Sequence, residues 1–164
     1  MVSWQHRSVV DPRSRSHDRK MKILFLCTGN SCRSQMAEGW ARQLKPDSLH
    51  PYSAGIEKHG MNPLAIQVMR EAGVDITSQN SKTVEELSDI AFDVVVTVCG
   101  HADEHCPAFH GAPRVMHVGF DDPPKLAFSC TTEEEKLSHY RRVRDEIKAF
   151  VESLPSSIEE RDAH

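Results

Sequence analysis

The fold is decided by residues 22–34, which read K-I-L-F-L-C-T-G-N-S-C-R-S. After Lys22 comes a short continuous apolar run that ends at Cys27, the pattern of a strand buried on both faces of a sheet. A polar loop with a glycine follows, and a helix is expected to begin near Arg33 or Ser34. The stretch therefore predicts a buried strand that passes through a tight loop directly into a helix.

The rest of the chain continues to alternate between strand and helix patterns. Further strands are expected over residues 50–54, 93–98 and 114–118, and further helices over 62–73, from 83, and from 131 or 132 to 155. Strands that alternate with helices predict a parallel sheet with right-handed crossovers. We expect an α/β fold, a single domain with a four-stranded parallel sheet flanked by helices on both faces, and a site at the carboxyl ends of the strands.

The chain of 164 residues and 18.5 kDa has the length of one domain. Residues 1–20 are rich in Arg, Ser and His without a sustained period, and are predicted to be a disordered N-terminal tail. The domain is expected over residues 21–155, because Pro155 stops the last helix. The acidic residues 156–164 are predicted to be a frayed C-terminal tail.

Charge and cysteine usage exclude several classes of protein. The formal net charge is −4, and the first twenty residues hold five Lys or Arg against two Asp, so fifteen basic and twenty-two acidic residues follow them. This balance argues against a general nucleic-acid binder, and no apolar run approaches the roughly 18 residues of a membrane span. The odd number of five cysteines, without an apolar secretory signal, argues against a secreted disulfide scaffold. We expect a monomeric, cytoplasmic protein that binds neither nucleic acid nor membrane.

The loop from Cys27 to Ser34 has the pattern C-x5-R-S at a strand-to-helix junction. Backbone N–H groups of such a loop and of the helix N-terminus converge on a tetrahedral anion, and Arg33 can clamp two of its oxygens. The same positive field favours the thiolate form of Cys27, and Ser34 can donate a hydrogen bond to its sulfur. The predicted oxyanion-binding residues are Thr28, Gly29, Asn30, Ser31, Cys32 and Arg33. The alternative is a buried strand-end cysteine beside an unrelated loop.

A carboxylic acid is expected at the end of the fourth strand, where Asp121 and Asp122 precede Pro123 and Pro124. An acid at this place can protonate an oxygen that leaves the bound anion. We choose Asp122, because Pro123 fixes the chain after it. The alternative is an ordinary acidic turn, in which Asp-Pro is common.

A further pair of thiols, Cys99 and Cys106, begins where the third strand ends. A helical or looped segment between them can bring the two sulfurs together, which suits a redox relay. Two alternatives stay open at this point. One is a zinc site that adds His101 and His105, in a spacing that fits no common structural zinc pattern, and the other is a pair of inert core cysteines.

Four motifs in this order resemble the thioredoxin-coupled arsenate reductases, which share the fold of low-molecular-weight protein tyrosine phosphatases. They are C-T-G-N-S-C-R-S-Q-M-A-E-G-W from Cys27, Y-S-A-G-I-E from Tyr52, the pair Cys99 and Cys106 after V-V-T-V, and G-F-D-D-P from Gly119. The resemblance extends over residues 21–154.

The resemblance implies a role for each matched residue. Cys27 would be the nucleophile on arsenic, Arg33 and the loop N–H groups would bind arsenate, and Asp122 would protonate the departing hydroxide. Cys99 would then attack Cys27 and release arsenite, and Cys106 would in turn attack Cys99 and form a disulfide with it. The final Cys99–Cys106 disulfide would be reduced by thioredoxin, with no bound cofactor and no metal.

The sequence departs from the family pattern in two places. Some relatives hold potassium near the cradle through four residues, of which Asn30, Glu38 and Ser53 match, while the fourth position is Lys82. Its ammonium either replaces the ion or is an ordinary exposed lysine. Cys130 lies in an extra stretch and is interpreted as a bystander, and Cys32 as not required for the reaction.

Two rival functions use subsets of these residues. A phosphatase acting on phosphotyrosine or a small phosphate ester would need only Cys27, Arg33 and Asp122. An arsenic- or metal-binding protein would use the thiols alone. The sequence does not decide between thioredoxin and the glutaredoxin–glutathione system as electron donor.

Overall fold

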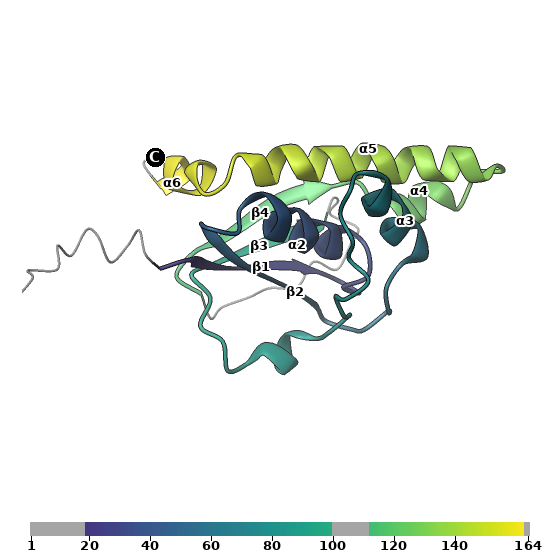
Figure 1. Ribbon diagram of the computed structural model, residues 1–164. Coiled ribbons are helices and arrows are strands. Elements are labelled where there is room, and N and C mark those ends of the chain that lie inside the picture. Colours follow the sequence, from purple (N-terminus) through teal and green to yellow (C-terminus); the bar gives the residue numbers. More distant parts are fainter. Residues whose placement is uncertain (1–18, 100–111, 163–164) are drawn as a thin grey trace, which may run out of the picture.

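The computed structural model describes residues 19–99 and 112–162 and builds them around one parallel sheet (Figure 1). The strands are β1 (Met21–Cys27), β2 (Leu49–Gly55), β3 (Val94–Cys99) and β4 (Val115–Phe120), in the spatial order β2-β1-β3-β4. All three neighbouring pairs are parallel. The expected four-stranded parallel sheet is confirmed, and the reversal of strand order beside β1 is where such sheets bind ligands.

Strand β1 is central because both of its faces are apolar. Ile23 and Phe25 point into the larger core beneath the helices, while Leu24 and Leu26 point to the opposite face, and all four are fully buried. The uninterrupted apolar run of the sequence is thus the signature of a strand covered on both sides. Its position in the centre of the sheet fixes where Cys27 emerges.

The helices cover the two faces unequally. They are α2 (Arg33–Leu44), α3 (Pro63–Glu71), α4 (Pro123–Ala127), α5 (Glu133–Glu152), α6 (Ser156–Asp162) and the short 3-10 helix η1 (Val84–Leu87). Helices α2, α3 and α5 pack together on one face, whereas the opposite face receives η1 and its flanking chain (Figure 1). The α/β fold class is confirmed, with the longer helices all on one side.

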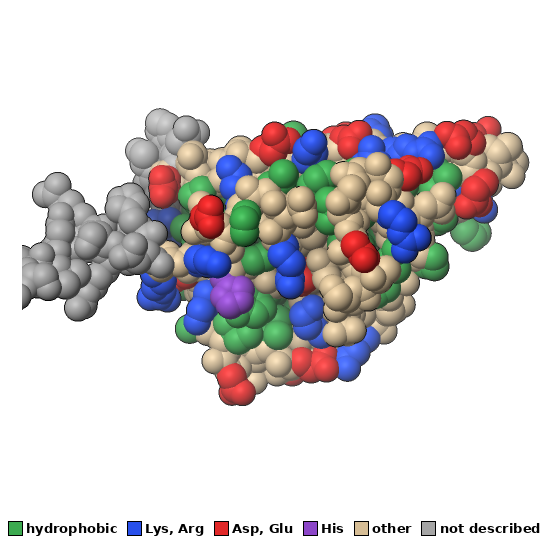
Figure 2. Space-filling model, in the orientation of Figure 1, with side chains coloured by type: hydrophobic (Ala, Val, Ile, Leu, Met, Phe, Trp, Pro, Cys, Tyr) green, Lys and Arg blue, Asp and Glu red, His purple; other side chains and the backbone are tan. Residues whose placement is uncertain are grey.

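The helix starts follow the signals in the sequence. Asn62 caps α3 by accepting hydrogen bonds from the backbone of Leu64 and Ala65, and Pro63 occupies the first turn. Thr132 accepts from the N–H of Glu135 at the start of α5, whose outer face carries interspersed acidic and basic side chains (Figure 2). These local signals are why both helix starts were predictable.

Two helices were not predicted. Helix α4 begins directly after Asp122 and has two prolines in its first turn, so the Asp-Pro sequence that was expected only to follow a strand is also a helix start. The predicted frayed tail is wrong for residues 156–162, which form α6. The physical reason is Ile158, which is 1% exposed and joins the main core together with Leu154. One apolar side chain holds an otherwise polar segment on the body.

Only residues 19 and 20 of the predicted N-terminal tail are described by the structure. Residues 1–18 lie outside the described part of the chain, while Arg19 forms an ion pair with Asp93 at 3.4 Å. Asp93 also accepts a hydrogen bond of 2.8 Å from the N–H of Lys22. Within residues 19–99 and 112–162, no helix is both long and apolar enough to cross a membrane.

Replacement of Ile158 by Ala should lower the free energy of unfolding by about 2–4 kcal/mol, because it removes a fully buried side chain from the core. Urea denaturation monitored by circular dichroism measures the change. The matched control is Ile56→Ala, the same chemical change at a residue that is 45% exposed, which should cost clearly less. Equal losses in the two variants would contradict the docking of α6.

Candidate active site

The loop between β1 and α2 places Cys27 and Arg33 at the carboxyl edge of the sheet. Cys27 is the last residue of β1 and Arg33 the first of α2, and both are nearly fully buried. The path must reverse within five residues, and Asn30 does so with a φ of +48°. Asn is among the few residues that tolerate this left-handed conformation.

The peptide planes of the loop are held from outside. The carbonyl oxygen of Thr28 accepts hydrogen bonds from Ile56 and Glu57, that of Gly29 from His59, and that of Ser31 from Asn62. In a trans peptide the N–H of the next residue points away from the carbonyl oxygen. Three loop carbonyls turned outward therefore turn three N–H groups inward, as an oxyanion cradle requires.

Close packing also explains the glycine of the loop. A Cβ on Gly29 would lie 2.1 Å from Nδ1 of His59, so a larger residue here would displace this ring from its place against the loop. His59 in turn hydrogen-bonds Glu57 at 2.8 Å. The segment after β2 thus forms a wall of the cradle, and His59 is a neighbour of the site that the sequence analysis did not single out.

The sulfur of Cys27 has a defined hydrogen-bond partner. Sγ lies 2.9 Å from Oγ of Ser34, and that same oxygen accepts a hydrogen bond of 2.9 Å from the side-chain amide of Asn30. Because the Asn30 amide donates to Ser34, the hydroxyl proton of Ser34 is available for Cys27. This geometry stabilises a sulfur anion. The predicted contact between Ser34 and Cys27 is present.

Arg33 and Asp122 meet across the sheet edge. Nη1 of Arg33 donates to the carbonyl oxygen of Phe120 at 2.9 Å, and Nη2 lies 3.8 Å from Oδ2 of Asp122. The neighbouring Asp121 instead forms an ion pair of 3.0 Å with Arg142 on α5. The choice of Asp122 over Asp121 agrees with this geometry. The guanidinium is buried and the carboxylate is 29% exposed, so the acid can exchange protons with solvent.

Cys32 lies in the same loop but in a different electrostatic environment. Burial raises the pKa of its thiol far above the usual range, and the nearby carboxylate of Asp122 raises it further. Its thiol therefore stays protonated. Burial also raises the pKa of the neighbouring Tyr140 to about 12, against the hydrogen bond that Asn62 donates to its hydroxyl.

Cys99 ends β3, the strand beside β1, and is fully buried. Leu26 and Thr97 are in register between the two strands, so Cys27 and Cys99 emerge at the same edge of the sheet. Cys106 lies outside the described residues, as do His101 and His105 of the zinc alternative. The Cys99–Cys106 pair therefore stays a prediction.

The other thiols can be placed more simply. Among the described cysteines, Cys27, Cys32 and Cys130 are free thiols. Cys130 is half-buried after α4, where its sulfur donates to the carbonyl of Leu126 at 3.5 Å. In the described part of the chain, no three His, Cys, Asp or Glu side chains are grouped to hold a metal ion.

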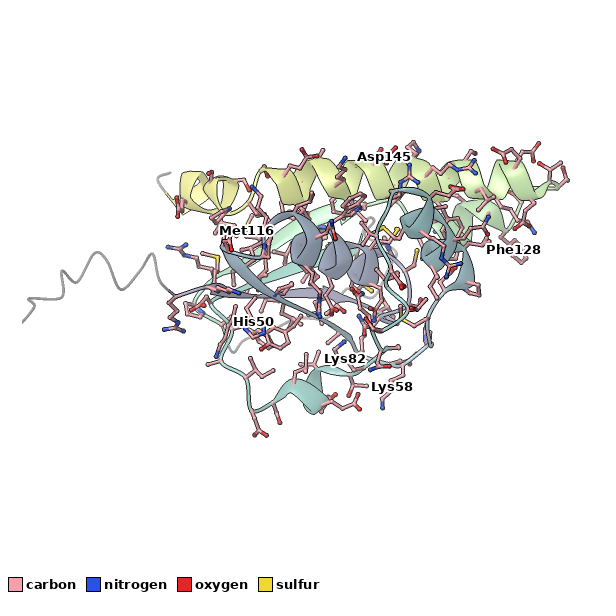
Figure 3. The ribbon with its side chains drawn as sticks, in the orientation of Figure 1. His50, Lys58, Lys82, Met116, Phe128 and Asp145 are labelled. Carbon is pink, nitrogen blue, oxygen red and sulfur yellow. The ribbon has the colours of Figure 1, made fainter. Side chains whose placement is uncertain are left out.

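The four positions that match a potassium site in relatives do come together. Oε1 of the buried Glu38 accepts from Ser53 at 2.8 Å, and Nζ of Lys82 lies 3.6 Å from the same oxygen (Figure 3). The backbone N–H of Lys82 donates to Oδ1 of Asn30 at 2.9 Å. A potassium ion at Glu38 would face the Lys82 ammonium at close range, so these residues do not fit the ion.

Comparison with known proteins identifies the family of the chain. The sequence profile of the family "Low molecular weight phosphotyrosine protein phosphatase" matches residues 22–163. An arsenate reductase of Halalkalibacterium halodurans is 51% identical over 138 residues, which are 82% of this chain and 97% of the relative.

Solved structures of similar proteins have the same fold. A structure described as an arsenate reductase in the phosphate binding state superposes with a TM-score of 0.69 at 33% identity, covering 84% of this chain and 98% of the other. A thioredoxin-dependent arsenate reductase of Corynebacterium glutamicum superposes with a TM-score of 0.61 at 22% identity. The match covers 90% of this chain and 66% of the other. With most of its length matched by the profile, this chain belongs to the low molecular weight phosphotyrosine protein phosphatase family.

Proposed function

We propose that this protein is an enzyme that reduces arsenate to arsenite. The observation that carries the proposal is the meeting of three groups at one sheet edge: the Cys27 sulfur bonded to Ser34, the Arg33–Asp122 pair, and a second thiol, Cys99, at the end of the neighbouring strand. The names of the similar curated proteins support the same reaction.

The first half of the reaction uses the cradle. Inward N–H groups and the Arg33 guanidinium bind the arsenate oxygens. The Cys27 thiolate attacks arsenic and forms an S–As bond, while Asp122 gives its proton to the departing oxygen, which leaves as water. Arsenic is still As(V) at this stage. The hydrogen bond from Ser34 keeps the sulfur anionic before attack.

The second half of the reaction uses the thiols. The Cys99 thiolate attacks Sγ of Cys27, and the electron pair of the broken S–As bond goes to arsenic, which leaves as As(III) in arsenite. Cys106 then attacks Cys99, releases Cys27 as a thiolate and completes a Cys99–Cys106 disulfide. Two thiols have lost two electrons, which balances the reduction of arsenate.

The disulfide must be reduced before the next turnover, and we assign this step to the dithiol protein thioredoxin. The designation of the similar protein from C. glutamicum as thioredoxin-dependent supports the assignment. A thiol–disulfide relay of this kind needs a reducing compartment, so we place the protein in the cytoplasm. We also propose that it is a monomer. No bound cofactor or metal is required by the steps above.

The rival functions leave parts of the site unexplained. Phosphate-ester hydrolysis does not need a second thiol at the edge of β3. The first aromatic residue after Asp122, Phe128, is 93% exposed beyond α4 (Figure 3). A thiol-based binding protein does not need Arg33 paired with Asp122. Reduction is the function that uses every group.

Cysteine variants test the order of the thiols. Cys27→Ser should abolish both arsenate reduction and any hydrolysis of a phosphate ester, because a hydroxyl at this place stays protonated. Cys106→Ser should stop multiple turnover while hydrolysis survives. The assay is arsenate-dependent NADPH consumption with thioredoxin and its reductase, and in parallel with glutaredoxin and glutathione. Cys130→Ser is the matched control and should turn over normally; normal turnover of Cys106→Ser would refute the relay.

The pair of adjacent acids tests the proton donor. Asp122→Asn should lower kcat/KM for arsenate by about a hundredfold or more, because the departing oxygen loses its acid. Asp121→Asn removes the same charge one residue away, where the carboxylate pairs with Arg142, and should change kcat/KM little. A comparable loss in both variants would show that charge, not proton donation, is what the site needs.

A further inference from the structure

Two buried glutamines, Gln35 and Gln79, connect to the nucleophile through other side chains. Gln35 is 0% and Gln79 7% exposed. We propose that both are positioning residues, which fix the direction of the Ser34 hydroxyl toward Cys27 through a chain of oriented hydrogen bonds. The proposal rests on the proposed function only in taking Cys27 as the nucleophile.

The chain runs through five side chains with one direction of donation. Gln79 donates to Oε1 of Gln35 at 2.9 Å, Gln35 to Oδ1 of Asn30 at 2.8 Å, and Asn30 to Oγ of Ser34 at 2.9 Å. The last link is the 2.9 Å contact between Ser34 Oγ and Cys27 Sγ.

Backbone carbonyl groups fix the orientation of the Gln35 side-chain amide. Its Nε2 lies 3.0 Å from the carbonyl oxygen of Asn30 and 3.0 Å from that of Asn80, and these oxygens can only accept. The amide nitrogen of Gln35 must therefore face them, which leaves its oxygen toward Gln79. The nitrogen of Gln79 is fixed in the same way, because it also donates to the carbonyl oxygen of Gln35 at 2.9 Å.

A backbone N–H group fixes the orientation of the Asn30 side-chain amide. The N–H of Lys82 donates to Oδ1 of Asn30, so this atom must be the amide oxygen, and Nδ2 must face Ser34. Ser34 Oγ, fully buried with its residue, then accepts from Nδ2 and has its proton free for the sulfur. Rotation of the Gln35 or Gln79 amide by 180° would place oxygen against oxygen, and rotation of the Asn30 amide would place its NH2 group against the N–H of Lys82.

The effect on the nucleophile follows from the order of the links. Hydrogen bonds in a buried chain polarise one another, so the loss of one link weakens the links that follow it. Without Gln79, the oxygen of Gln35 loses its donor, while backbone groups still hold the direction of the Gln35 and Asn30 amides. The hydrogen bond from Ser34 to Cys27 is then weaker, and the sulfur anion is less stabilised.

The test is the pH dependence of Cys27 alkylation by iodoacetamide, measured on the reduced full-length protein and resolved from the other cysteines by peptide mass spectrometry. The thiolate is the reacting form, so the ratio of the rates at pH 6 and pH 9 reports its stabilisation. We expect Gln79→Met to lower this ratio about threefold or more, as for partial loss of a hydrogen bond to a charged group. Gln35→Met should lower it further, because it cuts the chain closer to Ser34.

Two controls separate positioning from a general loss of stability. Ile158→Ala destabilises the core without touching the chain, and Gln67→Met makes the same replacement at an exposed glutamine of α3. Both should keep the parent ratio. Gln79→Ala serves if the methionine variant does not fold, since it removes the donor without adding bulk. A parent-like ratio in the Gln79 variant, or an equal fall in Ile158→Ala, would overturn the proposal.

A second readout does not depend on reactivity. In 15N-labelled protein, the side-chain NH2 resonances of Asn30 should shift in the Gln79 variant, while the backbone N–H resonance of Lys82, which links the same segment to Asn30 by a second route, should stay in place. Unshifted Asn30 resonances would also overturn the proposal. Because neither measurement uses arsenate, a protein that failed to reduce arsenate would refute the proposed function and leave this proposal standing.

Discussion

The whole site depends on the conformation of Asn30. A chain that leaves a buried strand and enters a helix within five residues must reverse its curvature, and Asn30 does so at a φ of +48°. A single residue in this region costs free energy, which the surrounding structure has to offset. Here the side-chain oxygen accepts from Lys82 and Gln35, and the nitrogen donates to Ser34. The same bonds that hold the backbone turn also aim a proton at Cys27.

Two charge pairs, each with one buried and one partly exposed partner, flank this loop. Arg33 faces Asp122 on the side of β4, and Glu38 faces Lys82 on the side of β2. A charge in a buried site needs a partner, because desolvation otherwise makes its ionised form too costly. The first pair leaves a guanidinium beside the inward N–H groups for an anion to bind. Lys82 shares the neutralisation of the Glu38 carboxylate with Arg42, which lies 2.9 Å from its other oxygen, so this carboxylate does not repel the anion from beneath the loop.

The sequence was informative wherever the signal was local. The apolar run before Cys27, the C-x5-R-S spacing and the Asn62–Pro63 start all act within a few residues, so they predicted β1, the cradle and α3. The tail beyond Pro155 was misjudged because its composition is polar, and only the tertiary position of Ile158 explains α6.

Features that depend on distant partners were out of reach of the sequence. The chain through Gln35 joins residues 44 apart, since Gln79 reaches it from beyond α3. In the sequence, the available signal for this chain was a glutamine, Gln35, directly after the R-S of the motif. The pairing of Glu38 with Lys82 had only a family pattern to suggest it, and its geometry needed the fold.

The loop holds two thiols, and the chemistry requires that only one reacts. Attack on arsenic or on sulfur needs a thiolate, so the protonation of each cysteine decides which bond forms. Cys27 receives the Ser34 hydrogen bond, whereas burial and the Asp122 carboxylate raise the pKa of Cys32. A protonated Cys32 does not compete with Cys99 for the Cys27 sulfur. Burial is the larger cause of the raised pKa of Cys32, and it acts throughout the reaction; the Asp122 carboxylate adds to it once this acid has given up its proton.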